Sequence, residues 1–314
     1  MNAEIEKIME NVHYDQLYDE WVSNFALNLE NIWNEPSARN LSENKLENEK
    51  AIVIGKGPSL KENNHLEKLA KSKFKGKIVC CDGSLITTLK AGVTPEKFPD
   101  FYVVSIEGRT GLKKYFDDEI VKKYGGKIKG IFSTVSDPEA IQYARKNGIS
   151  IHWFHALFDY KEGKKSFNQI SALMVRAKNH PKGLPGVQTG GNVGTTSWFV
   201  SWQILKCSTV TLIGINHGWN ENDPIELITS HGHEYPVPEI DVDSELFNKL
   251  FPKVYNPEFD CYCILDPIFQ YYSAGFKEFI KRSPDEINTI NATEGGVIFG
   301  EKIKCMTFEN FLNS

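Results

Sequence analysis

The pattern of apolar positions changes near residue 50. Before that point, apolar residues recur at helical spacing, which predicts a helix within residues 1–36: Leu17, Trp21, Phe25, Leu29, Ile32 and Trp33. The polar stretch that follows predicts a linker or surface crossover. Residues 1–48 are therefore expected to form a helical N-terminal extension, which serves either as a cap on the main domain or as an oligomer contact.

From residue 49 onward, short apolar runs alternate with segments of helix length. The runs are continuous, as expected of strands buried on both faces, and cover 51–54, 77–81, 101–106, 128–132, 150–154 and 208–214. Helix candidates lie at 59–72, 84–91, 111–124, 137–147 and 193–206. This alternation predicts a three-layer, Rossmann-like α/β domain over 49–314 with a mostly parallel sheet.

The remaining segments are less regular. Residues 159–190 are polar and predict an excursion over the site, and 216–262 predict loops with short helices. Helical spacing returns between Phe269 and Ile280, and 287–290 and 302–305 are expected to add one or two edge strands.

Composition narrows the class of protein. With 314 residues, 40% hydrophobic and 25% charged, the chain is typical of a globular protein. A net charge of −5 gives no electrostatic reason to expect a nucleic-acid or membrane partner. The sequence shows neither a run of about 20 apolar residues nor the basic start of a signal peptide. A cytoplasmic protein without a membrane span is expected.

The six cysteines predict no metal site. Cys80, Cys81, Cys207 and Cys305 lie in or beside apolar runs, as small buried hydrophobic residues do. Residues 261–263 read Cys-Tyr-Cys, which lacks the two-residue spacer of a zinc or redox pair.

Residues 55–59, Gly-Lys-Gly-Pro-Ser, follow the first predicted strand. Two glycines let the backbone approach an anion, and Ser59 is placed to cap a helix whose N–H groups favour one. The sequence is neither a P-loop nor the dinucleotide fingerprint. The residues alone leave two interpretations: a strand-to-helix turn with Pro58 at the first helical position, or a phosphate cradle made by Gly55, Lys56, Gly57, Pro58 and Ser59.

A second glycine turn, 188–196, opens the helix before the last buried strand. Glycines and hydroxyls again gather at a helix start, so phosphate or sugar contact is favoured over turn geometry alone. The predicted contacts are Gly190, Gly191, Asn192, Val193, Gly194 and Thr195.

Polar residues also follow several predicted strands, and the carboxyl ends of parallel strands meet at one edge, where ligands bind. Carboxylates there could accept hydrogen bonds from ribose or a base, or bind a divalent metal. The candidates are Asp82, Gly83, Ser84, Glu107, Thr134 and Asn216.

Three histidines fall in the irregular region, and one of them, His217, could act as a general base. His231 and His233 lack the spacing of a two-ligand helix site. Residues 291–296, Asn-Ala-Thr-Glu-Gly-Gly, by themselves indicate only a turn.

Taken in order, these motifs resemble the MptE-like family, long catalogued as a domain of unknown function. The resemblance is carried by the sequences at 52–60, 92–95, 103–107, 190–196 and 210–216. It implies one of two activities. One branch comprises 6-hydroxymethyl-7,8-dihydropterin diphosphokinases that use ATP. The other comprises sialyltransferase-like motility accessory factors, tied to decorating flagellin with nonulosonic acids from CMP-sugars.

Two features resemble the glycosyltransferase-like branch. The tail from 271–274 to 291–296 looks like that branch's ending, which implies Asn291, Thr293 and Glu294 as substrate contacts. The His-Ala-His-Gly-Asp-Asn segment of the pterin enzymes is missing. Asp82-Gly83 resembles the pterin branch instead. Glu107 and Asn216 stand where the family usually shows Asp, which puts activity or substrate in question.

The leading hypothesis is therefore a transferase that uses a CMP-activated sugar, with His217 and Glu107 as catalytic residues and a protein or glycan as acceptor. The alternatives are a pterin diphosphokinase that uses ATP with Mg²⁺ and a non-catalytic nucleotide-binding module. The sequence leaves open whether the protein forms a homo-oligomer.

Overall fold

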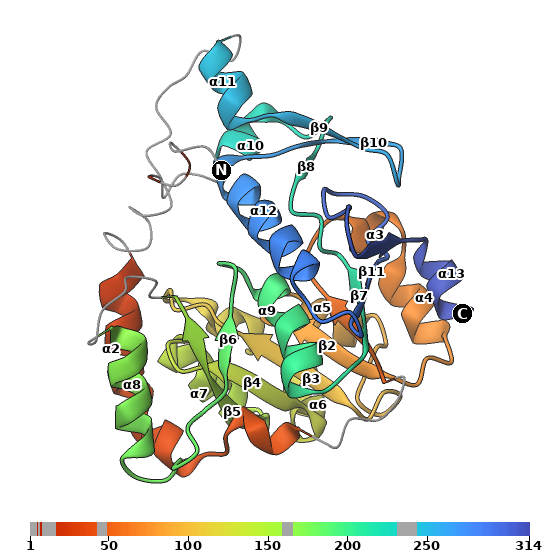
Figure 1. Ribbon diagram of the computed structural model, residues 1–314. Coiled ribbons are helices and arrows are strands. Elements are labelled where there is room, and N and C mark those ends of the chain that lie inside the picture. Colours follow the sequence, from red (N-terminus) through yellow and green to blue (C-terminus); the bar gives the residue numbers. More distant parts are fainter. Residues whose placement is uncertain (1–4, 6, 8–16, 43–48, 159–165, 231–243) are drawn as a thin grey trace.

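The computed structural model describes residues 5, 7, 17–42, 49–158, 166–230 and 244–314 (Figure 1). His231, His233 and residues 43–48, the last part of the predicted linker, lie outside these ranges. No helix in the described part of the chain is long and apolar enough to cross a membrane.

The core of the molecule is a nine-stranded sheet in which every neighbouring pair of strands is parallel. Its spatial order is β12-β11-β7-β1-β2-β3-β4-β5-β6. The strands are β1 (Lys50–Ile54), β2 (Lys77–Cys81), β3 (Phe101–Ser105), β4 (Lys129–Ser133), β5 (Ser150–Leu157), β6 (Gly186–Gln188), β7 (Thr209–Ile213), β11 (Asn288–Asn291) and β12 (Ile303–Cys305).

Helices cover both faces of this sheet. From β1 to β5 each successive strand is added on the same side of the one before it, so the chain advances across the sheet in one direction. The crossovers through α9 and α12 lead to β7 and β11 and run across the sheet in the opposite direction. Right-handed crossovers therefore place the two sets on opposite faces, and Figure 1 shows α9 and α12 on the near side. The helices are α2 (Tyr18–Asn34), α3 (Ser59–Glu62), α4 (His65–Lys71), α5 (Leu85–Lys90), α6 (Glu119–Tyr124), α7 (Pro138–Lys146), α8 (Phe167–Arg176), α9 (Val193–Phe199), α10 (Ile225–Ser230), α11 (Glu245–Leu250), α12 (Pro267–Lys281) and α13 (Phe308–Leu312).

The predicted fold class is confirmed: the chain is a three-layer α/β protein with a parallel sheet. All six predicted strands are present, and 288–291 and 303–305 add two strands as expected. Several predicted helices are shorter. The helix at 59–72 is divided because Asn64 adopts a left-handed conformation, with φ of 51°, that interrupts a helix. The helix at 193–206 ends in a π-helical turn at Val200–Ile204.

The irregular segments contain structure that the sequence pattern did not predict. Residues 159–190 include α8 and β6, and 216–262 include a small antiparallel sheet of order β8-β10-β9. Its strands are β8 (Trp219–Asn220), β9 (Lys253–Asn256) and β10 (Cys261–Ile264). Strands of two to four residues are too short for an alternating pattern to be recognised.

Helix α2 packs on the main domain, as the cap interpretation expects. Its residues Phe25 and Ile32 belong to the same hydrophobic cluster as the strands of the large sheet. After it, Ser37 pairs with Trp153 of β5 in an isolated bridge. The N-terminal segment therefore shares one core with the sheet.

The strand order reverses beside β1, because β2 to β6 lie on one side of it and β7, β11 and β12 on the other. Beyond the ends of β1 and β7, the two chains stay in contact. Gly55 N–H donates to the Ile213 carbonyl at 2.9 Å, and Gly57 N–H donates to the Gly214 carbonyl at 2.8 Å. A Cβ at position 55 would lie 2.2 Å from the Gly214 oxygen. The close approach of the two segments therefore requires glycine here.

Replacing Gly55 by alanine is expected to lower the free energy of unfolding by about 2–3 kcal/mol, because the new methyl group overpacks a backbone contact. Gly275→Ala is the matched control: it lies within α12, where the added methyl group would meet no neighbouring atom within 4 Å, and should raise stability by about 0.5–1 kcal/mol. Denaturant unfolding of both variants measures this. Wild-type stability of the Gly55→Ala protein would contradict the tight contact.

Candidate functional site

The carboxyl ends of β1 and β7 form the topological switch point of the sheet, where ligands of open α/β folds bind. The turn at 55–59 lies here. Pro58 is the N-cap residue of α3, and Ser59 is the first helical residue, so Ser59 does not cap the helix as the sequence suggested. Its hydroxyl instead donates to Asn216 Oδ1 at 2.9 Å. Gly55 and Gly57 both lie against Gly214 at the end of β7, so the glycines of the turn serve at least in part for packing.

Asn216 connects three segments at this point. Its side chain accepts the hydrogen bond from Ser59, and its carbonyl accepts one from Val297 N–H at 2.9 Å. Gly296, with φ of 74°, lies so close that a Cβ would come within 2.2 Å of the Asn216 oxygen. Asn216 is 5% exposed, so it lies beneath the surface of the switch point.

The turn at 291–296 contacts Asn216 through Gly296. Asn291 Nδ2 donates to the Ile298 carbonyl at 2.6 Å, and Thr293 Oγ1 accepts from Ile215 N–H at 3.3 Å. Glu294 accepts hydrogen bonds from His65 and from Phe308 N–H, both at 3.0 Å. These three predicted substrate residues have partners inside the protein. Their contact with substrate stays a prediction.

The second glycine turn lies between β6 and α9. Gly190 and Gly191 have φ of 56° and 78°, conformations that favour glycine. Asn192 is the N-cap of α9, where its Oδ1 accepts from Thr195 N–H at 2.8 Å. A Cβ at Gly194 would lie 2.8 Å from Ile215, which follows β7. This packing brings the start of α9 against the end of β7, so the two predicted glycine turns lie at one edge of the sheet.

Asp82 is the buried carboxylate of the site, at the end of β2. Its Oδ1 accepts from Gly83 N–H at 2.6 Å and its Oδ2 from the Ser105 hydroxyl at 2.7 Å. Burial raises the pKa of Asp82 to about 6, opposed by the two hydrogen bonds. Ser84 donates to the Ile54 carbonyl at 2.9 Å, which ties this segment to β1.

Lys56 brings a positive charge next to Asp82. Its side chain passes Gly83, where a Cβ would lie 3.1 Å from Lys56 Cδ, and its ammonium lies 5.0 Å from the centre of the Tyr115 ring. Lys56 is exposed, so it can reach a ligand at the switch point. Its charge favours the ionised form of Asp82.

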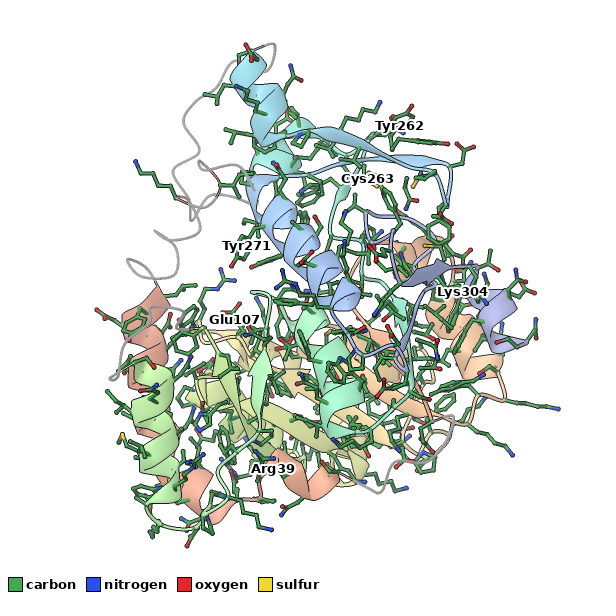
Figure 2. The ribbon with its side chains drawn as sticks, in the orientation of Figure 1. Arg39, Glu107, Tyr262, Cys263, Tyr271 and Lys304 are labelled. Atoms are coloured by element: carbon green, nitrogen blue, oxygen red, sulfur yellow. The ribbon has the colours of Figure 1, made fainter. Side chains whose placement is uncertain are left out.

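Glu107 follows β3 and lies at the upper edge of the large sheet, below α12, in Figure 2. Its carboxylate pairs with Arg109 Nη2 at 2.8 Å and is 29% exposed. Burial raises the pKa of Glu20 in α2, and the negative charge of nearby Glu107 adds to this rise. Among the described residues, no group of three acidic, histidine or cysteine side chains could hold a metal ion.

His217 and Thr134 have protein neighbours on most sides. His217 has φ of 46° and packs among Phe269, Tyr272 and Phe276 of α12. Burial lowers its pKa to about 4, so the imidazole is neutral at physiological pH and only a weak base. Thr134 Oγ1 lies 3.4 Å from His155 Nδ1. Their predicted roles in catalysis and nucleotide binding stay predictions.

The site also uses residues that the sequence pattern did not indicate. Ser105 is the last residue of β3 and binds Asp82, whereas Tyr115 packs against Lys56 from a 3₁₀ turn. Two asparagines of α2 contact the loops after β3 and β4. A serine at the end of a predicted strand was a usable signal, but contacts from α2 depend on how it docks.

The ionisation of Asp82 should make stability depend on pH. Its folded pKa lies above its ordinary value near 4, so the folded state binds the proton more tightly. The contribution of protonated Asp82 to the free energy of unfolding is fully present below about pH 4 and is lost as the pH rises through about 6. Asp82→Asn keeps one acceptor for Gly83 N–H, and its amide nitrogen can donate to the Ser105 oxygen in place of accepting from the Ser105 hydroxyl, without the charge.

The Asp82→Asn variant should therefore be more stable than wild type at pH 7 by about 2–3 kcal/mol, and the difference should shrink toward pH 4. Denaturant unfolding of both proteins between pH 4 and pH 7 measures it. A difference that is independent of pH would contradict the raised pKa.

The fold and the switch-point loops define an open α/β protein of the kind that binds ligands at the carboxyl edge of its sheet. The model of the family described as 6-hydroxymethylpterin diphosphokinase MptE-like matches residues 23–222. The chain belongs to this MptE-like family, as the motifs predicted.

A solved structure similar to this chain is the MAf glycosyltransferase from Magnetospirillum magneticum AMB-1, with a TM-score of 0.59 and 15% sequence identity. The match covers 91% of this chain and 38% of the glycosyltransferase, so the chain spans well under half of that protein. At this identity the likeness concerns the fold. No curated protein matches the chain.

Proposed function

We propose that this protein is a nucleotide-dependent transferase, and that its donor is a CMP-activated sugar. The observation that carries the proposal is the packing of Gly55 and of Gly194, at the start of α9, against Ile215 beside Asn216 at the switch point of the sheet, with the exposed Lys56 next to Gly55. The family membership and the glycosyltransferase-like fold of the solved structure support transfer chemistry.

In the proposed reaction, a hydroxyl of the acceptor attacks the anomeric carbon of the sugar and CMP leaves with the bonding electron pair. Negative charge therefore develops on the phosphate of CMP. Lys56 and backbone N–H groups of the two turns would stabilise that charge. Gly55 and Gly57 N–H are already bonded to the carbonyls of Ile213, at the end of β7, and of Gly214 after it, so Lys56 carries most of this role on the β1 side.

The acceptor hydroxyl must also lose a proton. Glu107 is the better placed base of the two predicted catalytic residues, because its side chain is partly exposed at the edge of the sheet, where an acceptor can reach it, whereas His217 is buried among aromatic rings. Asp82 and Asn216 would orient the ribose or the base.

The second candidate function is pterin diphosphokinase activity, in which ATP donates a pyrophosphoryl group. The description of the matching family and the Asp82-Gly83 pair favour it. A buried carboxylate can recognise the donor groups of a pterin ring. Formation of AMP from ATP and 6-hydroxymethyl-7,8-dihydropterin in the presence of Mg²⁺ would establish it, whereas binding of CMP without ATP would remove it.

CMP should raise the melting temperature of the protein at millimolar concentration in a screen with CDP, UDP, ATP and a pterin. Lys56→Met should weaken CMP binding about tenfold, since it removes one charge-assisted contact. Lys61→Met is the matched control, because Lys61 is exposed one turn later in α3. A protein that no nucleotide stabilises would sink the proposal. Equal affinities in all three proteins would remove Lys56 from the site.

The double variant Glu107→Asp and Asn216→Asp tests whether the chain is an active enzyme or a binding module. The Ser59 hydroxyl can donate to a carboxylate at 216 as it does to Asn216 Oδ1. If the departures reduced activity, turnover of a CMP-sugar should rise by about tenfold or more in the double variant, with CMP affinity changed less. If turnover is instead lower in the double variant than in the wild type, Glu107 and Asn216 suit this chain's own substrate.

A further inference from the structure

Helix α2 holds the two loops that follow β3 and β4 through two buried asparagines. Asn24 Nδ2 donates to the Gly108 carbonyl at 2.7 Å and to the Val135 carbonyl at 3.2 Å. Asn28 Nδ2 donates to the Ser136 carbonyl at 2.9 Å and to the Thr134 carbonyl at 3.3 Å. One turn of α2 thus binds the backbone of both loops.

These side chains are built into the interior. Asn24 is 6% exposed and Asn28 is 1% exposed. Neighbouring Trp21 packs so closely on the first loop that a Cβ at position 108 would lie 2.5 Å from its ring. A hydrophobic residue at 24 or 28 would provide ordinary packing for a cap helix. Two amides instead satisfy carbonyls that strand pairing has left open.

The two loops carry residues of the candidate site. Glu107 precedes Gly108 in the first loop, and Thr134 lies in the second. A path of hydrogen bonds also leads from Asn28 to the buried carboxylate. Asn28 binds the Ser136 carbonyl, the Ser136 hydroxyl donates to the Ser105 carbonyl at 3.1 Å, and the Ser105 hydroxyl donates to Asp82.

We infer that Asn24 and Asn28 are positioning residues of the site, and that α2 is part of its working structure in addition to capping the core. This inference rests on the proposed function. Its physical basis is that a carboxylate on a loop must be held within a fraction of an ångström of its productive place, which requires a second layer of fixed contacts. The hydrophobic contacts of Phe25 and Ile32 keep α2 in place, and the asparagines set the two loops against it.

The experiment compares Asn24→Ala and Asn28→Ala with wild type in two measurements at 25 °C: CMP affinity by calorimetry, and hydrogen exchange of the amides at 106–111 and 133–137. Asn147→Ala is the matched control. Asn147 Nδ2 also donates to a loop carbonyl, that of Phe116 at 2.6 Å, but it lies after α7, at the amino-terminal edge of the sheet. If a variant folds poorly, Asn28→Ser provides a milder change at the same position.

We expect each α2 variant to weaken CMP binding about tenfold, because a small displacement of a positioned group is costly, and to speed exchange in the two loops while the amides of β1 and β2 stay protected. Asn147→Ala should lower stability and change CMP affinity by less than about twofold. Unchanged CMP affinity in a folded α2 variant overturns the inference. If wild type binds no nucleotide, the proposed function fails, and unchanged exchange in the two loops then overturns the inference separately.

Discussion

The contact between the ends of β1 and β7 is the constraint on which the rest of the site depends. Two amide-to-carbonyl hydrogen bonds continue the pairing of these strands beyond the sheet. They hold the segments so close that side chains are excluded at 55 and 57, and the turn at 291–296 packs on Asn216 so closely that a side chain is excluded at 296 as well. Because the strand order reverses here, the same contact that closes the fold also fixes the 55–59 turn, Asn216 and the start of α9 at one edge.

This arrangement changes how the glycine turn is understood. In the sequence, the two glycines indicated room for an anion. In the structure the two glycines make room for the segment at the end of β7, and the N–H group of each already donates to a carbonyl of that segment. A ligand at this edge would therefore meet the lysine between the glycines and the loops around it. The ionised carboxylate of buried Asp82 costs stability at neutral pH, which is the kind of cost that functional sites retain.

Much of the fold was readable because the strands are continuous apolar runs and the segments between them are long enough to hold a helix. Structure was missed where elements are short, as in β8, β9 and β10, or where polar flanks hide a helix, as in α8. The residues at the strand ends were predicted to meet, and Asp82, Glu107 and Asn216 do follow β2, β3 and β7 at one edge. Which of the predicted site residues have partners inside the protein could not be predicted, since Thr293 and Glu294 find theirs in Ile215 and His65, far away in sequence.

The sequence by itself determined the class of fold, the family and the edge of the sheet at which the candidate residues gather, because these depend on local patterns and on the fixed direction of parallel strands. Only the tertiary structure decided what each polar residue does there. Hydrogen bonds such as those from Asn24, Asn28 and Ser59 join segments more than 80 residues apart, and no local pattern records them. The 55–59 turn is thus predicted by sequence as a site, and the structure shows that Lys56 is the exposed, charged residue of that turn.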